Sequence, residues 1–182
     1  MSSTVLHALH IIESDKHAVG NLNNWNVELL NQGAVALERL ENYSIVELGW
    51  QADGDQERTM KYLTDESKKG YLVCAVEDYM SEYGETISNF FIEEGERGRV
   101  VRQHETLRFD VSNYELTDPS KEDELKNGTP AYWNVAKKKF VICNNGPDAN
   151  YANAGNKYVV AFSDGLVLGG QKIIRLEIDN EN

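Results

Sequence analysis

The sequence has few cysteines, little positive charge and no long apolar run. Cys74 and Cys143 are its only cysteines, and two cysteines so far apart specify neither a metal site nor a redox pair. Each lies in an apolar, strand-like run, so we expect buried free thiols. No apolar run approaches the roughly 18 to 20 residues that a helix needs to cross a bilayer, and we therefore expect no membrane partner.

Positive charge is scarce. Lys and Arg total 18 against 30 Asp and Glu, which gives a formal net charge of −12 and a pI of about 4.8. Binding to a phosphate backbone requires clustered cations, so the composition predicts no nucleic-acid partner. Residues 1–17 do not have the basic start of a signal peptide, and we expect the protein to be made and kept in a cytoplasm.

Signatures of catalysis and of cofactor binding are also absent. The serines do not lie in a Gly-x-Ser-x-Gly turn, and the cysteines match no histidine-containing signature. Gly95-Glu96-Arg97-Gly98 does not have the order of a phosphate-binding loop, and its glutamate would repel phosphate. His7 and His10 share a face only in a helix and have no third ligand nearby in the sequence. We therefore expect no enzyme, no cofactor and no metal.

The chain is long enough for one well-buried core. Of its 182 residues, 41% are hydrophobic and 26% are charged, as is ordinary for a soluble globular protein. No repeat of fixed period is visible. Strand-like runs alternate with turn residues after residue 43. The first three runs, 44–50, 58–63 and 71–76, are expected to form a meander. The runs are 44–50, 58–63, 71–76, 107–111, 132–135, 139–143, 158–162, 165–168 and 172–178.

This pattern predicts a mainly β fold, either a small β-barrel or a sandwich, with one short helix and long surface loops. We expect an N-terminal arm or edge segment over 1–24 and a single mainly β domain over 25–182. A helix and a hairpin both fit 25–43, and we favour the hairpin, with its turn at 31–33. The Asn-rich stretch 144–157 has almost no large aliphatic residues and is expected to be an exposed loop.

A short helix is expected after Asp118-Pro119. Ser120 is the expected cap, with Asp123 three residues further on.

The least generic stretch runs from Tyr79 to Val111. Seven acidic residues between Glu77 and Glu96 precede four arginines between Arg97 and Arg108, and the sign of the charge changes near Gly95. The i, i+3, i+4 spacing of apolar residues predicts a short helix before Gly95, and alternation after residue 106 predicts a strand. The residues that carry these two patterns are Ile87, Phe90 and Phe91 for the helix, and Leu107, Phe109 and Val111, alternating with Arg108 and Asp110, for the strand.

The order of this stretch resembles a known family. A short aromatic helix, then Glu-Gly-Glu-Arg-Gly-Arg, then Val-Val-Arg-Gln-His-Glu-Thr-Leu-Arg-Phe-Asp-Val is similar to capsid decoration or cement proteins, which tailed bacteriophages encode beside the major capsid protein. The resemblance extends to Asn31-Gln32-Gly33-Ala34-Val35 with Leu37, and more loosely to residues 173–178.

The resemblance covers about half of the chain as scattered blocks. It implies a small β-rich domain that binds the outer capsid surface of the virion, is assembled in the host cytoplasm and does no chemistry. The implied partner is the major capsid protein, and self-association into a homo-oligomer is also open.

Four arginines and two phenylalanines are the candidate interaction residues: Arg97, Arg99, Arg102, Arg108, Phe90 and Phe91. The guanidinium group is a planar, bidentate donor to carboxylates. The arginines could equally neutralise Glu93 to Glu96 within the same molecule. Two other functions stay open: a β-module that binds carbohydrate or a host surface through its Asn-rich loop, and a small β-barrel enzyme.

Overall fold

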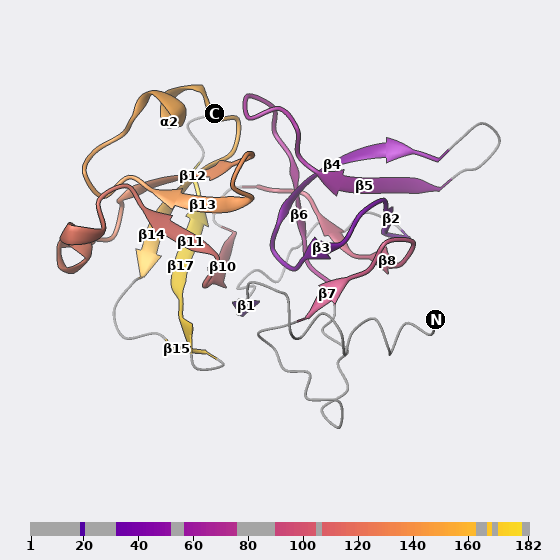
Figure 1. Cartoon of the computed structure of the whole chain (residues 1–182), viewed down its shortest axis with the longest axis horizontal. Coiled ribbons are helices and arrows are strands. Elements are labelled where there is room, and N and C mark those ends of the chain that lie inside the picture. Colours follow the sequence, from indigo (N-terminus) through magenta and orange to yellow (C-terminus); the bar gives the residue numbers. More distant parts are fainter. Residues whose placement is uncertain are drawn as a thin grey trace.

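The structure, a computed structural model, describes residues 19–20, 32–51, 57–75, 90–104, 107–162, 167–168 and 171–179. Most of the predicted arm, the residues before the turn at 31–33 and nearly all of the predicted aromatic helix lie outside these ranges. The described residues form two barrel-like sheets and two short ribbons (Figure 1). The prediction of a mainly β fold with little helix is confirmed.

The N-terminal barrel is a six-stranded sheet in the order β8-β2-β5-β4-β6-β9. β8 and β9 lie at opposite ends of this sheet, yet only Arg99 separates them in the chain, so the segment 97–101 closes the sheet into a barrel. The strands are β2 (Ala34–Ala36), β4 (Ile45–Trp50), β5 (Arg58–Tyr62), β6 (Tyr71–Val73), β8 (Arg97–Gly98) and β9 (Val100–Val101).

The predicted meander of β4, β5 and β6 is wrong. β4 pairs with both β5 and β6, and β5 takes β2 as a parallel partner on its other edge. Because both edges of β5 are occupied, β6 pairs with the other edge of β4. Residues 63–70 connect the end of β5 to β6.

The C-terminal barrel is a seven-stranded sheet in the order β1-β10-β17-β14-β12-β13-β11. Here residues 108–116 close the barrel, because β10 pairs with β17 while β11 pairs with β13. The short strand β1 adds to β10 as an edge segment. The strands are β1 (Val19–Gly20), β10 (Arg108–Val111), β11 (Tyr114–Leu116), β12 (Pro130–Asn134), β13 (Lys139–Ile142), β14 (Lys157–Phe162) and β17 (Ile174–Ile178).

The two barrels have the same strand pairing. Each barrel can be described as five strands counted in chain order, with β8–β9 and β10–β11 each counted as one strand. In both barrels the first strand runs parallel to the third. The second strand pairs with the third and the fourth, and the fifth strand pairs with the fourth and the first. The N-terminal copy consists of β2, β4, β5, β6 and β8–β9. The C-terminal copy consists of β10–β11, β12, β13, β14 and β17. The chain thus builds one barrel topology twice, although no repeat is visible in the sequence.

One apolar cluster joins the two barrels. Phe109 is fully buried, and its ring contacts Tyr43, Phe140 and Tyr158 at centroid distances of 5.5, 5.6 and 5.8 Å. Tyr43 lies between β3 and β4 of the N-terminal half, whereas the other three rings lie in the C-terminal barrel. Leu107 and Val111 are buried beside Phe109, which confirms the predicted inward face of this strand.

Two ribbons flank the barrels: β3 (Leu40–Glu41) with β7 (Phe91–Ile92), and β15 (Val167–Leu168) with β16 (Gln171–Lys172). The prediction that Phe91 is helical is wrong, because pairing with Leu40–Glu41 gives this segment a strand partner. A helix over 32–43 is also excluded, since this range contains β2 and β3. Gln32 and Gly33 have φ values of 64° and 67°, the left-handed conformations that a tight hairpin turn uses.

Among the described residues of the C-terminal half, two segments form short helices. In η3 (Pro119–Glu124) the N-cap is Asp118, whose side chain accepts a hydrogen bond from Ser120 N. The prediction that Ser120 is the cap is therefore wrong. In α2 (Ala149–Asn153) the cap is Asp148. The stretch 144–157 is therefore not simply an exposed loop: it contains α2, and Ala154 and Asn156 at its end are buried.

Candidate interaction site

The four predicted arginines lie on both barrels and are all exposed. Arg97 is in β8, Arg99 follows it at the closure of the N-terminal barrel, and Arg102 comes directly after β9, while Arg108 opens β10 of the C-terminal barrel. Gly98 and Val100 point inward between the exposed side chains of this segment. The sequence placed these four arginines in one candidate interaction set, whereas the structure divides them between two sheets, and their role in an interaction stays a prediction.

Arg97 and Arg108 form ion pairs within the chain. The Arg97 guanidinium donates to the carbonyl oxygen of Gln32 at 2.8 Å and pairs with Glu57. Arg108 pairs with Glu177 on the neighbouring strand β17. Both pairs are exposed, and such pairs contribute about 0 to 1 kcal/mol each. Their carboxylate partners lie outside Glu93–Glu96, so intramolecular neutralisation does occur, but with other acids than expected.

Phe90 and Phe91 lie against the protein interior. Phe91 is buried, and the Arg39 guanidinium lies over its ring at 3.4 Å from the centroid. Phe90 is half-buried against the main apolar cluster. Phe91 therefore packs within the fold, and any direct contact with a partner would have to come from the exposed part of Phe90.

A buried acid was missed by the sequence analysis. Alternation along β10 predicts that Asp110 points outward with Arg108, but Asp110 is 4% exposed. Arg175 of β17 donates to both of its carboxylate oxygens, at 2.7 and 2.9 Å, and this pairing raises the pKa of Arg175. The bidentate pair fixes the register of β10 against β17.

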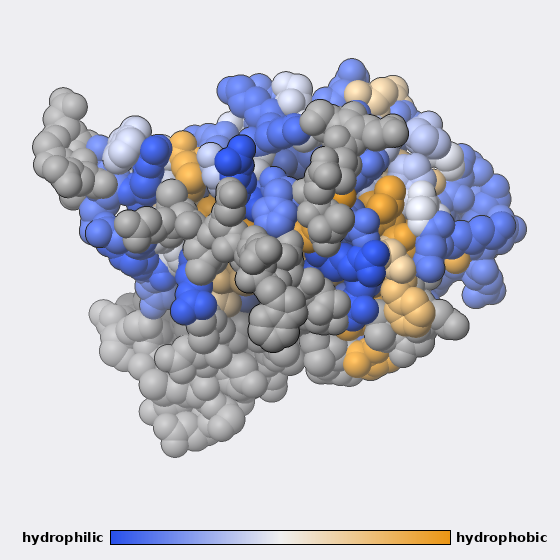
Figure 2. All heavy atoms as spheres, turned by 180° about the vertical axis from the view of Figure 1, so that it is seen from behind, coloured by the Kyte–Doolittle hydropathy of each residue, from blue (hydrophilic) through white to orange (hydrophobic). Residues whose placement is uncertain are grey.

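The exposed tryptophan Trp50 is the most unusual feature of the surface. Seen from behind, the described residues, which are the coloured ones in Figure 2, present a mostly hydrophilic surface with several hydrophobic patches. Trp50 is 63% exposed at the end of β4, and the Arg58 guanidinium of β5 lies 3.6 Å from its ring centroid. β4 and β5 project from the N-terminal barrel as a hairpin (Figure 1). The exposed large hydrophobic residues of the described chain are Leu37, Trp50, Phe162 and Val167.

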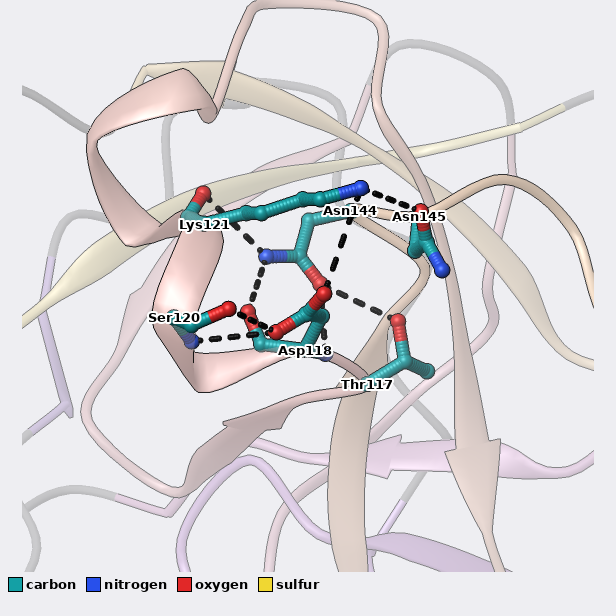
Figure 3. Close-up of polar contacts among 6 residues, drawn as sticks. All are labelled: Thr117, Asp118, Ser120, Lys121, Asn144 and Asn145. Carbon is teal, nitrogen blue, oxygen red and sulfur yellow. Dashed lines mark hydrogen bonds and ion pairs between the residues drawn. The ribbon is translucent and has the colours of Figure 1, made fainter.

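A polar cluster beside η3 has a structural role. Figure 3 shows the Asn144 amide at its centre: its oxygen accepts from Thr117 Oγ1 and Asp118 N, and its nitrogen donates to the carbonyl oxygens of Asp118 and Lys121. Ser120 donates to the Asp118 carboxylate, which lowers the pKa of Asp118. The cluster thus holds η3 against the turn that follows β13.

Neither cysteine forms a disulfide, as predicted, but the prediction that both are buried holds for Cys143 only, because Cys74 is partly exposed. Burial raises the pKa of the Cys143 thiol to about 11, so it is protonated at neutral pH. Within the described ranges, no three His, Cys, Asp or Glu side chains come together as a metal ion would require. Among the same residues, no helix has the length and apolar character needed to cross a membrane.

Comparison with known proteins gives a consistent result. The family model described as YonC prophage protein matches residues 13–179. The "SPbeta prophage-derived uncharacterized protein YonC" of Bacillus subtilis (strain 168) is 33% identical over 174 residues, which cover 92% of this chain and 94% of that protein. No solved structure matches the chain significantly.

Proposed function

The chain belongs to the YonC prophage protein family, and from this premise we propose that it is a structural accessory protein of a phage particle. In this proposal it attaches non-covalently to the outside of the head as a decoration or cement subunit, with the major capsid protein as its partner. It acts by binding and not by catalysis, and its place is the capsid surface of the virion.

The observation that carries the proposal is the exposed Trp50–Arg58 pair on the projecting hairpin. Tryptophan and arginine are the residue types that most often dominate binding at protein interfaces. Burying a large apolar side chain contributes about 1.5 to 3 kcal/mol, and the stacked guanidinium already holds the indole in place. A partner that covers this pair gains apolar contact without first having to order the side chain.

The charge of the chain fits attachment to a larger partner. A net charge of −12 makes free copies repel one another, which keeps them dispersed until a surface with compensating cations binds them. Exposed ion pairs contribute little, so apolar contact must supply most of the affinity. Salt should therefore weaken attachment modestly without abolishing it. The role of Arg97, Arg99, Arg102 and Arg108 in attachment stays a prediction.

A carbohydrate-binding or host-binding role has less support. It would use the Asn-rich stretch, but the side-chain amides of Asn144 and Asn156 are engaged in hydrogen bonds within the chain. One face of the Trp50 ring, which a sugar would stack on, is covered by Arg58.

The test is sedimentation of phage particles from an induced lysogen that encodes this chain. We expect the protein to sediment with assembled heads and to remain largely bound in moderate salt. Trp50→Ala should lower the number of copies per head, whereas Phe162→Ala, which truncates an exposed aromatic of the other barrel, should not.

Two outcomes would contradict different parts of the proposal. If heads never carry the protein, the head-attachment role is wrong. If Trp50→Ala and Phe162→Ala leave equal copy numbers, the hairpin is not the contact.

A further inference from the structure

A pocket of about 300 Å³ lies where the two barrels meet. The N-terminal barrel contributes residues 69–71 and 102–103 to its walls, and the C-terminal barrel contributes 155–157 and 178–179. The pocket is separate from the Trp50 hairpin, and nothing in the proposed attachment to a phage head uses it.

The four lining segments occupy equivalent places in the two barrels. Residues 69–71 and 155–157 lead into the fourth strand of their barrel, β6 and β14. Residues 102–103 and 178–179 lie at the end of the fifth strand, β9 and β17. Matching parts of the repeated topology therefore face each other across the pocket, as they do in a site between the two subunits of a symmetric dimer.

A buried amide network fixes the floor of the pocket. The Asn156 side-chain oxygen accepts from Gly70 N at 2.8 Å and from Gln103 Nε2 at 2.9 Å, and its nitrogen donates to the carbonyl oxygen of Lys68 at 2.7 Å. The Tyr158 hydroxyl donates to Gln103 Oε1 at 2.6 Å. Because these groups bond to one another, the floor has a fixed shape, and recognition of a charged ligand falls to the side chains at the rim.

The rim is positively charged in an acidic protein. Lys69, Arg102 and Lys157 line it together with a single lining carboxylate, Asp179. Lys69 and Arg102 are exposed, and the Lys157 ammonium lies 5.2 Å from the centroid of the Tyr151 ring. Three cations from three separate segments of a chain with a net charge of −12 converge on one concave site.

We propose that this pocket binds a small ligand that carries a phosphate or carboxylate group, held by Lys69, Arg102 and Lys157. Ammonium and guanidinium groups both form charge-assisted hydrogen bonds to such oxyanions. A volume of about 300 Å³ is at the small end of the usual range for ligand sites, which suits a ligand of a few heavy atoms around the anionic group.

The test is isothermal titration of the full chain with inorganic phosphate and, separately, with citrate, at low ionic strength where charge contacts are least screened. Both should bind at millimolar concentration. Arg102→Gln and Lys157→Gln should each weaken binding about fivefold, between the effects of an exposed and a buried charge contact. Lys126→Gln removes an exposed lysine outside the pocket and should leave the affinity unchanged.

Asp179→Asn gives an independent check in the opposite direction. It removes the lining carboxylate but retains an oxygen that can accept from the Tyr151 hydroxyl, which lies 3.2 Å from Asp179 Oδ2. Affinity for both anions should rise, while Glu124→Gln, the matched change at an exposed acid on η3, should have no effect. The proposal is overturned if neither anion binds the wild-type protein, or if the pocket variants and their matched controls change the affinity equally.

Discussion

Asn156 links the two barrels through its side-chain amide, and replacing it should destabilise the whole chain. The residue is 5% exposed and lies directly before β14 in the C-terminal barrel. Its amide bonds to Gly70 N and Lys68 O of the N-terminal barrel and to Gln103 Nε2, which follows β9. Asn156→Ala removes all three hydrogen bonds and adds no steric conflict.

The size of the effect follows from which groups lose their partner. Gln103 Nε2 keeps its bond to the Gly70 carbonyl oxygen at 2.8 Å, so two groups are affected: the Gly70 N–H and the Lys68 carbonyl. A buried polar group without a partner costs about 1 to 3 kcal/mol. We therefore expect Asn156→Ala to lower the free energy of unfolding by about 2 to 6 kcal/mol, nearer the lower figure if water from the pocket reaches the Lys68 carbonyl.

Urea unfolding followed by tryptophan fluorescence and by far-UV circular dichroism measures this loss. The matched control is Asn145→Ala, because Asn145 is exposed and its side-chain oxygen accepts a bond from the Lys121 ammonium at the surface. The control should change stability by no more than about 0.5 kcal/mol. Equal stability of the two variants would show that the Asn156 amide does not hold the barrels together.

Three further perturbations test the core and the titration of buried groups. Phe109→Ala should lower the free energy of unfolding by about 3 to 5 kcal/mol and Phe90→Ala by clearly less, because Phe109 is fully buried and Phe90 only half-buried; equal losses in a urea titration would contradict this ranking. Burial raises the pKa of Tyr62 from 10.0 to about 12, so the folded state favours the neutral phenol and wild-type stability should fall as pH rises from 10.0 towards 12. Tyr62→Phe should reduce this fall, and unchanged alkaline slopes would refute the assignment. Burial also raises the pKa of Cys143 to about 11, so iodoacetamide at neutral pH should label Cys143 only in urea, and rapid labelling of the native protein would be inconsistent with a buried thiol.

Strand positions were predictable because alternation and turn residues are local signals. β4, β5 and β13 begin within one residue of the predicted starts. The inward face of β10 was also correct, since Leu107, Phe109 and Val111 recur at period two. Such signals need only a window of a few residues, and they indicate where a strand lies but not what it pairs with.

Features that depend on distant partners could not be predicted. Asp110 has the position of an outward-facing residue, and it is buried because it pairs with Arg175, 65 residues away. Asn156 lies in a stretch with almost no aliphatic residues, and its burial depends on Gly70, 86 residues away. For the same reason the predicted meander was wrong, since the preference of β5 for β2 over β6 is not a property of the intervening loop.

The candidate site was predictable in its residue types but not in its arrangement. Ion pairing of the arginines within the chain was expected with Glu93 to Glu96, but the pairing of Arg97 with Glu57 and of Arg108 with Glu177 depends on which strands are neighbours. Trp50 carries no local signal that separates it from a core tryptophan such as Trp133, which is 1% exposed. Its exposure arises because β4 and β5 extend beyond the barrel as a hairpin (Figure 1).

The repeated barrel was invisible in the sequence for a physical reason. Backbone pairing requires only extended conformation and apolar residues on the inward face, so two copies of one topology need share no particular residue. The equivalent positions after the fifth strands illustrate this, since Arg102 follows β9 and Asp179 follows β17. Opposite charges at matching places make the pocket between the barrels electrostatically asymmetric, and an anionic ligand should therefore approach Arg102 and avoid Asp179, although both barrels have the same strand pairing.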